Sequence, residues 1–124
     1  MKNVIAMDDA IARGKVRPPM RDRRYAIRFP FAADAEFIDL ETGVQTHGVT
    51  SDLSLGGCFV CTNRPLKPGA RVRVSLTRKD GRFEALAMVR IVKQRVGMGV
   101  EFIDLDRTSL NLLQRWIEQL RRER

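Results

Sequence analysis

The feature that most constrains the fold is a series of short segments in which apolar and polar residues alternate. In one of them, Val72, Val74 and Leu76 alternate with polar neighbours. A period of two is typical of a strand with one buried and one exposed face. In the second segment we expect Val49 and Leu53 to point inward. The expected strands are 31–37, 44–54, 58–62, 72–76, 83–92 and 98–102.

Turn signals separate these strands, and a different period follows the last one. Gly43, Gly56-Gly57 and Asp80-Gly81 stand between successive segments, and Asp-Gly is a strong hairpin signal. Residues 106–109 offer N-cap candidates for a helix through about residue 122. Its apolar residues follow helical spacing, and Trp116 is expected to pack between helix and barrel. These residues are Leu110, Leu112, Leu113, Trp116, Ile117 and Leu120.

Together these patterns predict a mainly β fold, a six-stranded antiparallel β-barrel followed by a C-terminal amphipathic α-helix. With 124 residues and 44% hydrophobic content the chain can form one domain with a single core. We expect residues 1–20 to be a flexible basic N-terminal arm, because they mix charges with glycine and proline and lack a sustained apolar period. Residues 21–124 then form the barrel domain with its helix.

The N-terminal sequence and the hydropathy pattern indicate a cytoplasmic protein. Its first residues, MKNVIAMDDA, reach two aspartates too early for a secretory signal. No apolar run approaches the roughly 20 residues that a membrane span requires, so we expect no membrane insertion.

The charge of the chain favours an anionic partner. The net charge is +8, and residues 1–28 contribute +5 of it, with eight Lys and Arg against three Asp. Within this stretch Arg24 and Arg28 form an R-x-x-x-R pair, preceded by Arg21 and Arg23. The arginine fork binds phosphate in bidentate fashion, pairs with guanine O6 and N7, and stacks on flat rings.

A second motif, D-x-S-x-x-G, lies between the second and third strands. If Leu53 is buried, the strand period places Asp52 and Ser54 on the opposite, outer face. Gly57 and the glycine before it allow positive φ and close approach of a ligand to the backbone. This face can accept hydrogen bonds from an edge rich in N–H donors. A guanine Watson–Crick edge is one such edge, but the pattern alone does not select it.

In these two motifs the sequence resembles the PilZ family of bacterial cyclic di-GMP receptors. The GMGVEF run at 97–102 also looks like the last barrel strand of that family, and the resemblance covers roughly residues 21–120. Both motifs, in the right order on a matching strand pattern, make it specific. The matching motif residues are Arg24, Arg28, Asp52, Ser54 and Gly57.

The resemblance implies a binding site for cyclic di-GMP. Arg24 and Arg28 would bind its phosphates and the guanine O6/N7 edge or stack on the bases, with Arg23 as an auxiliary contact. Asp52 would accept from guanine N1–H and the exocyclic amine, which adenine does not present in the same way. Ser54 would add a hydroxyl contact.

The wrapping of the ligand that the resemblance implies leads to a hypothesis for signalling. Gly57 would permit the backbone geometry of the site, and the arginine segment would wrap the ligand. We expect residues 1–28 to change on binding and to signal through a protein partner that the sequence does not identify. Whether one ligand molecule or a stacked pair binds stays open.

Other functions are weaker alternatives. One is a PilZ-like protein-interaction module that does not bind the dinucleotide, and another is a general nucleic-acid-binding barrel, although the chain has few aromatic platforms and we expect no DNA binding. We expect no enzyme, no cofactor and no metal site. Cys58 and Cys61 form a C-x-x-C, but their odd spacing on a strand sends them to opposite faces, and His47 stands alone.

Overall fold

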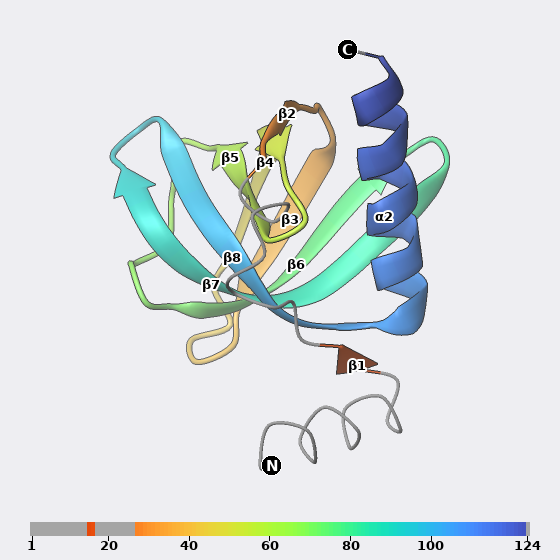
Figure 1. The fold of residues 1–124 in the computed structure, drawn as a ribbon. Coiled ribbons are helices and arrows are strands. Elements are labelled where there is room, and N and C mark those ends of the chain that lie inside the picture. The colour runs from red at the N-terminus through yellow and green to blue at the C-terminus, as the bar shows by residue number, and fades with distance from the viewer. Residues whose placement is uncertain (1–14, 17–26, 124) are drawn as a thin grey trace.

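The computed structural model describes residues 15–16 and 27–123, which form a closed β-barrel with one helix against its side (Figure 1). The predicted arm therefore lies outside the described residues, except for two residues that pair with the last strand. The elements are β1 (Lys15–Val16), β2 (Phe29–Pro30), β3 (Asp34–Asp39), β4 (Gln45–Leu53), β5 (Gly57–Cys61), β6 (Arg71–Arg78), β7 (Gly81–Lys93), β8 (Gly97–Asp106) and α2 (Arg107–Arg122).

Six of the strands form the barrel. They follow the order β8-β5-β4-β3-β6-β7, and a further pairing between β7 and β8 closes the ring. All pairings are antiparallel, and the closed ring satisfies the backbone groups that an open edge would expose. The six-stranded antiparallel barrel with a C-terminal helix, predicted from the sequence, is thus confirmed.

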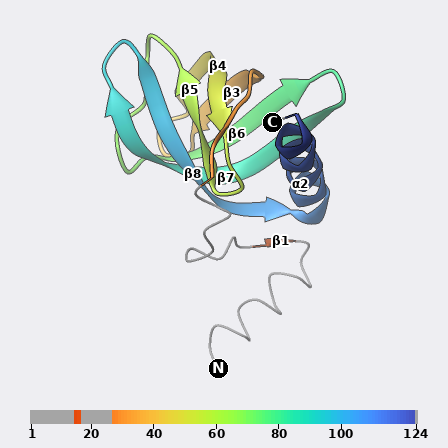
Figure 2. The same ribbon diagram turned by 45° about the horizontal axis from the view of Figure 1, so that its top comes forward.

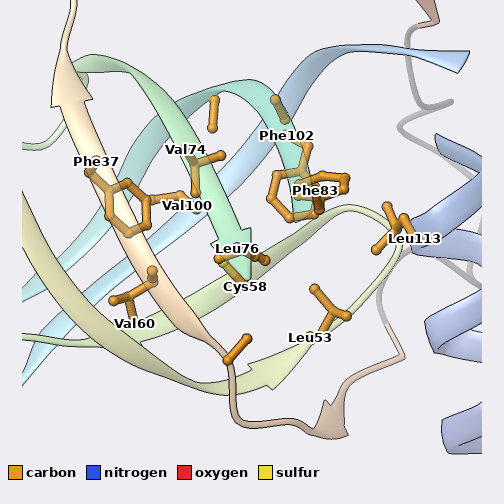
Figure 3. Packing of buried hydrophobic residues seen from close by; sticks show 14 of the residues in the cluster. Phe37, Leu53, Cys58, Val60, Val74, Leu76, Phe83, Val100, Phe102 and Leu113 are labelled. Carbon is orange, nitrogen blue, oxygen red and sulfur yellow. The ribbon is translucent and has the colours of Figure 1, made fainter. Parts of the chain in front are cut away.

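The inward positions of the strands fill the barrel with apolar side chains. Phe37, Phe83 and Phe102 are at most 2% exposed, and the last two rings pack with their centroids 4.9 Å apart. Figure 3 shows Leu113 pointing from α2 toward the same interior. Burial of these side chains is the main favourable term for the fold, at roughly 1.5–3 kcal/mol for each large one.

Helix α2 begins where the sequence predicts and covers one side of the barrel (Figure 2). The Asp106 carboxylate accepts from the Ser109 backbone N–H at 2.8 Å, which caps the first turn. Trp116 is fully buried, and its Nε1–H donates to the Asp80 carboxylate of the β6–β7 hairpin at 3.0 and 3.1 Å. The predicted packing role of this residue is confirmed.

One inward position in β4 differs from the prediction. Val49 is 48% exposed, whereas Thr50 is 3% exposed and Leu53 is fully buried. The register of β4 against β5 shifts between Thr50 and Asp52. This irregularity inserts a residue and reverses the alternation, so that the even positions point inward before it and Leu53 after it. The expectation that Val49 points inward is therefore wrong.

Candidate functional site

The two predicted motifs meet where β2 pairs with β4 (Figure 1). In this antiparallel pair Phe29 lies opposite Leu53, so the residue before β2 lies beside the end of β4. The Arg28 Nη1 donates to Asp52 Oδ1 at 2.6 Å. The structure thus joins one arginine of the first motif to the carboxylate of the second, although 24 positions separate them.

Arg23 and Arg24 lie outside the described residues. Their proposed contacts with a ligand therefore remain predictions from the resemblance of the motif.

The strand irregularity and a buried threonine position the acidic residue. Thr50 accepts from the Ala33 N–H at 2.9 Å and donates to the Phe31 carbonyl at 2.7 Å, which fastens the segment between β2 and β3 onto β4. After the register shift, Asp52 points outward with its side chain 28% exposed. The carboxylate is therefore accessible to a ligand while its backbone is fixed in the sheet.

Ser54 departs from the prediction that it shares the outer face with Asp52. It is only 3% exposed, because β4 ends at Leu53 and the chain turns there. Its hydroxyl accepts from the N–H groups of Gly56 and Gly57 at 3.2 and 3.1 Å. In this structure Ser54 holds the shape of the turn, as serine often does.

Gly57 is needed for close packing of two strands and does not adopt the positive φ that glycine allows. Among the described glycines only Gly43 and Gly69 have positive φ. A Cβ added at Gly57 would lie 2.1 Å from the Val100 carbonyl oxygen, a distance that no real side chain tolerates. The glycine thus allows β5 to pair closely with β8 at this end of the strand.

Gly57→Ala is accordingly expected to destabilise the barrel by about 1–3 kcal/mol, the usual cost of forced overpacking. The matched control is Gly99→Ala on β8, where an added Cβ meets side-chain atoms only at 3.7 Å. Urea unfolding of both variants measures the difference. Equal stability of the two variants would contradict the steric role of Gly57.

Next to the Arg28–Asp52 pair the surface is hollowed over about 220 Å³. We call this feature the Arg28–Arg90 hollow. Two of its charged residues, Arg90 and Glu101, were not predicted from the sequence. The only sequence signal for them is that both occupy polar positions of predicted strands. Residues that line the hollow include Arg28, Ser54, Gly57, Arg90, Gly99 and Glu101.

The Cys58 thiol, which is buried near the ion pair, is protonated at neutral pH. Burial raises the pKa of Cys58 to about 12, with a further rise from the Asp52 charge and a smaller opposing effect from Arg28. Cys61 is exposed, which confirms that the C-x-x-C side chains face apart. Within residues 27–123 no three His, Cys, Asp or Glu side chains gather as metal ligands would.

The Arg28–Asp52 ion pair is weak enough for a ligand to compete with it. The Arg28–Asp52 pair is partly exposed, with side chains 52% and 28% accessible, and such pairs contribute only about 0–1 kcal/mol. A charge-assisted hydrogen bond to a ligand contributes roughly 1.5–3 kcal/mol. A carboxylate has two oxygens that can each accept, so Arg28 on Oδ1 leaves acceptor capacity for a second donor.

In the part of the chain that the structure describes, no helix combines the length and apolar character that spanning a bilayer demands.

Comparison with known proteins gives a consistent family. The PilZ domain family model matches residues 22–119. No curated protein sequence matches the chain.

Solved structures share the fold at low sequence identity. The PilZ domain of CeSA from a cellulose-synthesising bacterium is 22% identical with a TM-score of 0.62, and the match covers 77% of this chain and 98% of that one. The PilZ domain of YcgR from Escherichia coli with c-di-GMP is 19% identical with a TM-score of 0.60, covering 84% and 94%. The inhibitor of motility MotI/DgrA from Bacillus subtilis is 18% identical with a TM-score of 0.66, covering 90% and 65%.

Proposed function

The chain belongs to the PilZ domain family, and on that premise we propose that it is a cyclic di-GMP receptor that signals through a protein partner. The observation that carries the proposal is the contact between Arg28 and Asp52 at 2.6 Å beside the Arg28–Arg90 hollow. One structural relative, the YcgR PilZ domain, is described with the same ligand.

Each described motif residue has a role in this proposal. Arg28 binds a phosphate or the O6/N7 edge of a guanine with its planar fork. Asp52 accepts from guanine N1–H and the exocyclic amine, which gives selectivity over adenine. Ser54 and Gly57 support the site without contacting the ligand. Ser54 fixes the turn, and Gly57 lets β5 and β8 pack closely.

The size of the hollow supports a contribution from residues before Arg28. Sites for drug-sized ligands usually span about 300–1,000 Å³, and this hollow has only about 220 Å³. The barrel face therefore holds part of a cyclic dinucleotide. We propose that Arg24, with Arg23 as an auxiliary contact, binds the remainder, and that residues 1–28, with their net charge of +5, change their arrangement when the anion binds. The process is binding, with no chemical step.

Amide hydrogen exchange tests both the location of the site and the change in the N-terminal segment. We expect cyclic di-GMP to slow exchange in residues 1–28 and in the turn 54–57, while the turn around Gly43, at the opposite end of β4, serves as the internal reference. Protection follows because bound ligand orders the groups it contacts. Equal exchange in both states would contradict the proposed change of the segment.

A further inference from the structure

A second ion pair lies on the Arg28–Arg90 hollow, contributed by strands that the two motifs do not include. The Nε of Arg90 in β7 donates to Glu101 Oε1 of β8 at 3.0 Å, and the Arg90 Nη2 lies 2.9 Å from the same oxygen. Both residues line the hollow together with Arg28. Two arginines, each held by a carboxylate, thus share one small depression whose lining includes the backbone of Gly57 and Gly99.

The Arg90 pair contributes little to stability. The Arg90 side chain is 54% exposed, so solvent screens its ion pair with Glu101. A guanidinium carries five N–H donors, and the bonds to Glu101 use only part of them. Its Nη1 lies 3.8 Å from the Met88 sulfur, a weak acceptor. Arg90 therefore retains donors for a stronger acceptor.

We propose, on the basis of the proposed function, that Arg90 is a further ligand-binding residue. It donates to a paired acceptor of the same cyclic di-GMP molecule that Arg28 and Asp52 bind. Such an acceptor is either a phosphate group or the O6/N7 edge of a guanine, because both match the arginine fork. Glu101 is a positioning residue that orients the guanidinium on the edge of the hollow.

The test compares two arginines of one strand. Arg82 of β7 is also half-exposed, at 57%, and pairs with Glu84 at 3.7 Å, but it does not line the hollow. Arg82→Ala and Arg90→Ala therefore remove the same charge from similar surroundings. We expect Arg90→Ala to weaken cyclic di-GMP binding roughly tenfold, the loss of one charge-assisted contact, and Arg82→Ala to leave the affinity within about twofold. Arg90→Lys, which keeps the charge and loses the fork, is expected to lie between wild type and Arg90→Ala.

A ligand analogue distinguishes the two acceptors. In cyclic di-GMP with 7-deazaguanine the N7 acceptor is absent and the phosphates are unchanged. If Arg90 binds the base edge, the difference between wild type and Arg90→Ala shrinks with the analogue. If Arg90 binds phosphate, the difference stays the same. Either result supports a contact between Arg90 and the ligand.

Failure of this inference differs from failure of the proposed function. If wild type binds, Arg28→Ala binds weakly and Arg90→Ala binds like Arg82→Ala, then only the role of Arg90 is wrong. If wild type itself does not bind cyclic di-GMP, both proposals are wrong. Thermal unfolding of each variant establishes that the fold is retained, as expected for exposed side chains.

Discussion

Arg28→Ala is expected to weaken cyclic di-GMP binding by about ten- to a hundredfold, because charge-assisted contacts contribute roughly 1.5–3 kcal/mol each. The variant removes the guanidinium that contacts Asp52 at 2.6 Å and leaves the carboxylate without that cation beside an anionic ligand. Both effects weaken binding. The stability of the fold should change by no more than about 1 kcal/mol, since the pair is partly exposed.

Arg82→Ala is the matched control for this loss as well. It removes a similarly exposed arginine that also pairs with a carboxylate. Calorimetric or fluorescence titration measures the affinities of both variants, and thermal unfolding establishes that each is folded. If the two variants bind cyclic di-GMP equally well, the assignment of Arg28 to the site is wrong.

The largest expected effect on stability comes from Trp116→Ala, which should lower the free energy of unfolding by about 3–5 kcal/mol. The Trp116 ring is fully buried between helix and barrel, with the Phe31 centroid at 5.1 Å and the Phe83 centroid at 6.5 Å. The substitution leaves a cavity there and also deprives the Asp80 carboxylate of its indole donor.

Urea unfolding followed by circular dichroism measures this loss, because Trp116 is the chain's one tryptophan and its fluorescence disappears with it. Trp116→Phe retains most of the ring and should recover much of the stability, while Gln119→Ala, at an exposed position of the same helix, should change it by less than about 0.5 kcal/mol. A loss below about 1 kcal/mol for Trp116→Ala would contradict the packing described for α2.

The barrel and its helix were predictable because their signals are local. Alternation identifies strands of five or more residues, and the Asp106 cap and the spacing of Leu113 and Trp116 identify the helix. The strand β2 has only two residues, which is too short for any period to show. Its pairing with β4 nevertheless brings Arg28 to Asp52. The contact between the two motifs could therefore be predicted only from the resemblance to the family.

The remaining errors and the missed residues depend on how the strands pair and where they end, which the sequence does not reveal. The shift between Thr50 and Asp52 reversed the face of Val49. The end of β4 at Leu53 moved Ser54 from the surface into the turn. Arg90 meets Glu101 only through the pairing of β7 with β8, in which the register shifts again between Val89 and Ile91. Such contacts between distant strands become visible only in the folded chain.

Isothermal titration calorimetry of the purified chain with cyclic di-GMP tests the central claim most directly, with cyclic di-AMP and GTP as controls. The account predicts saturable binding of cyclic di-GMP and much weaker binding of the other two. Cyclic di-AMP lacks the guanine N1–H from which Asp52 would accept, and GTP lacks the second guanine and the phosphodiesters of the dinucleotide. An absence of binding at high micromolar cyclic di-GMP, or equal binding of all three nucleotides, would contradict it.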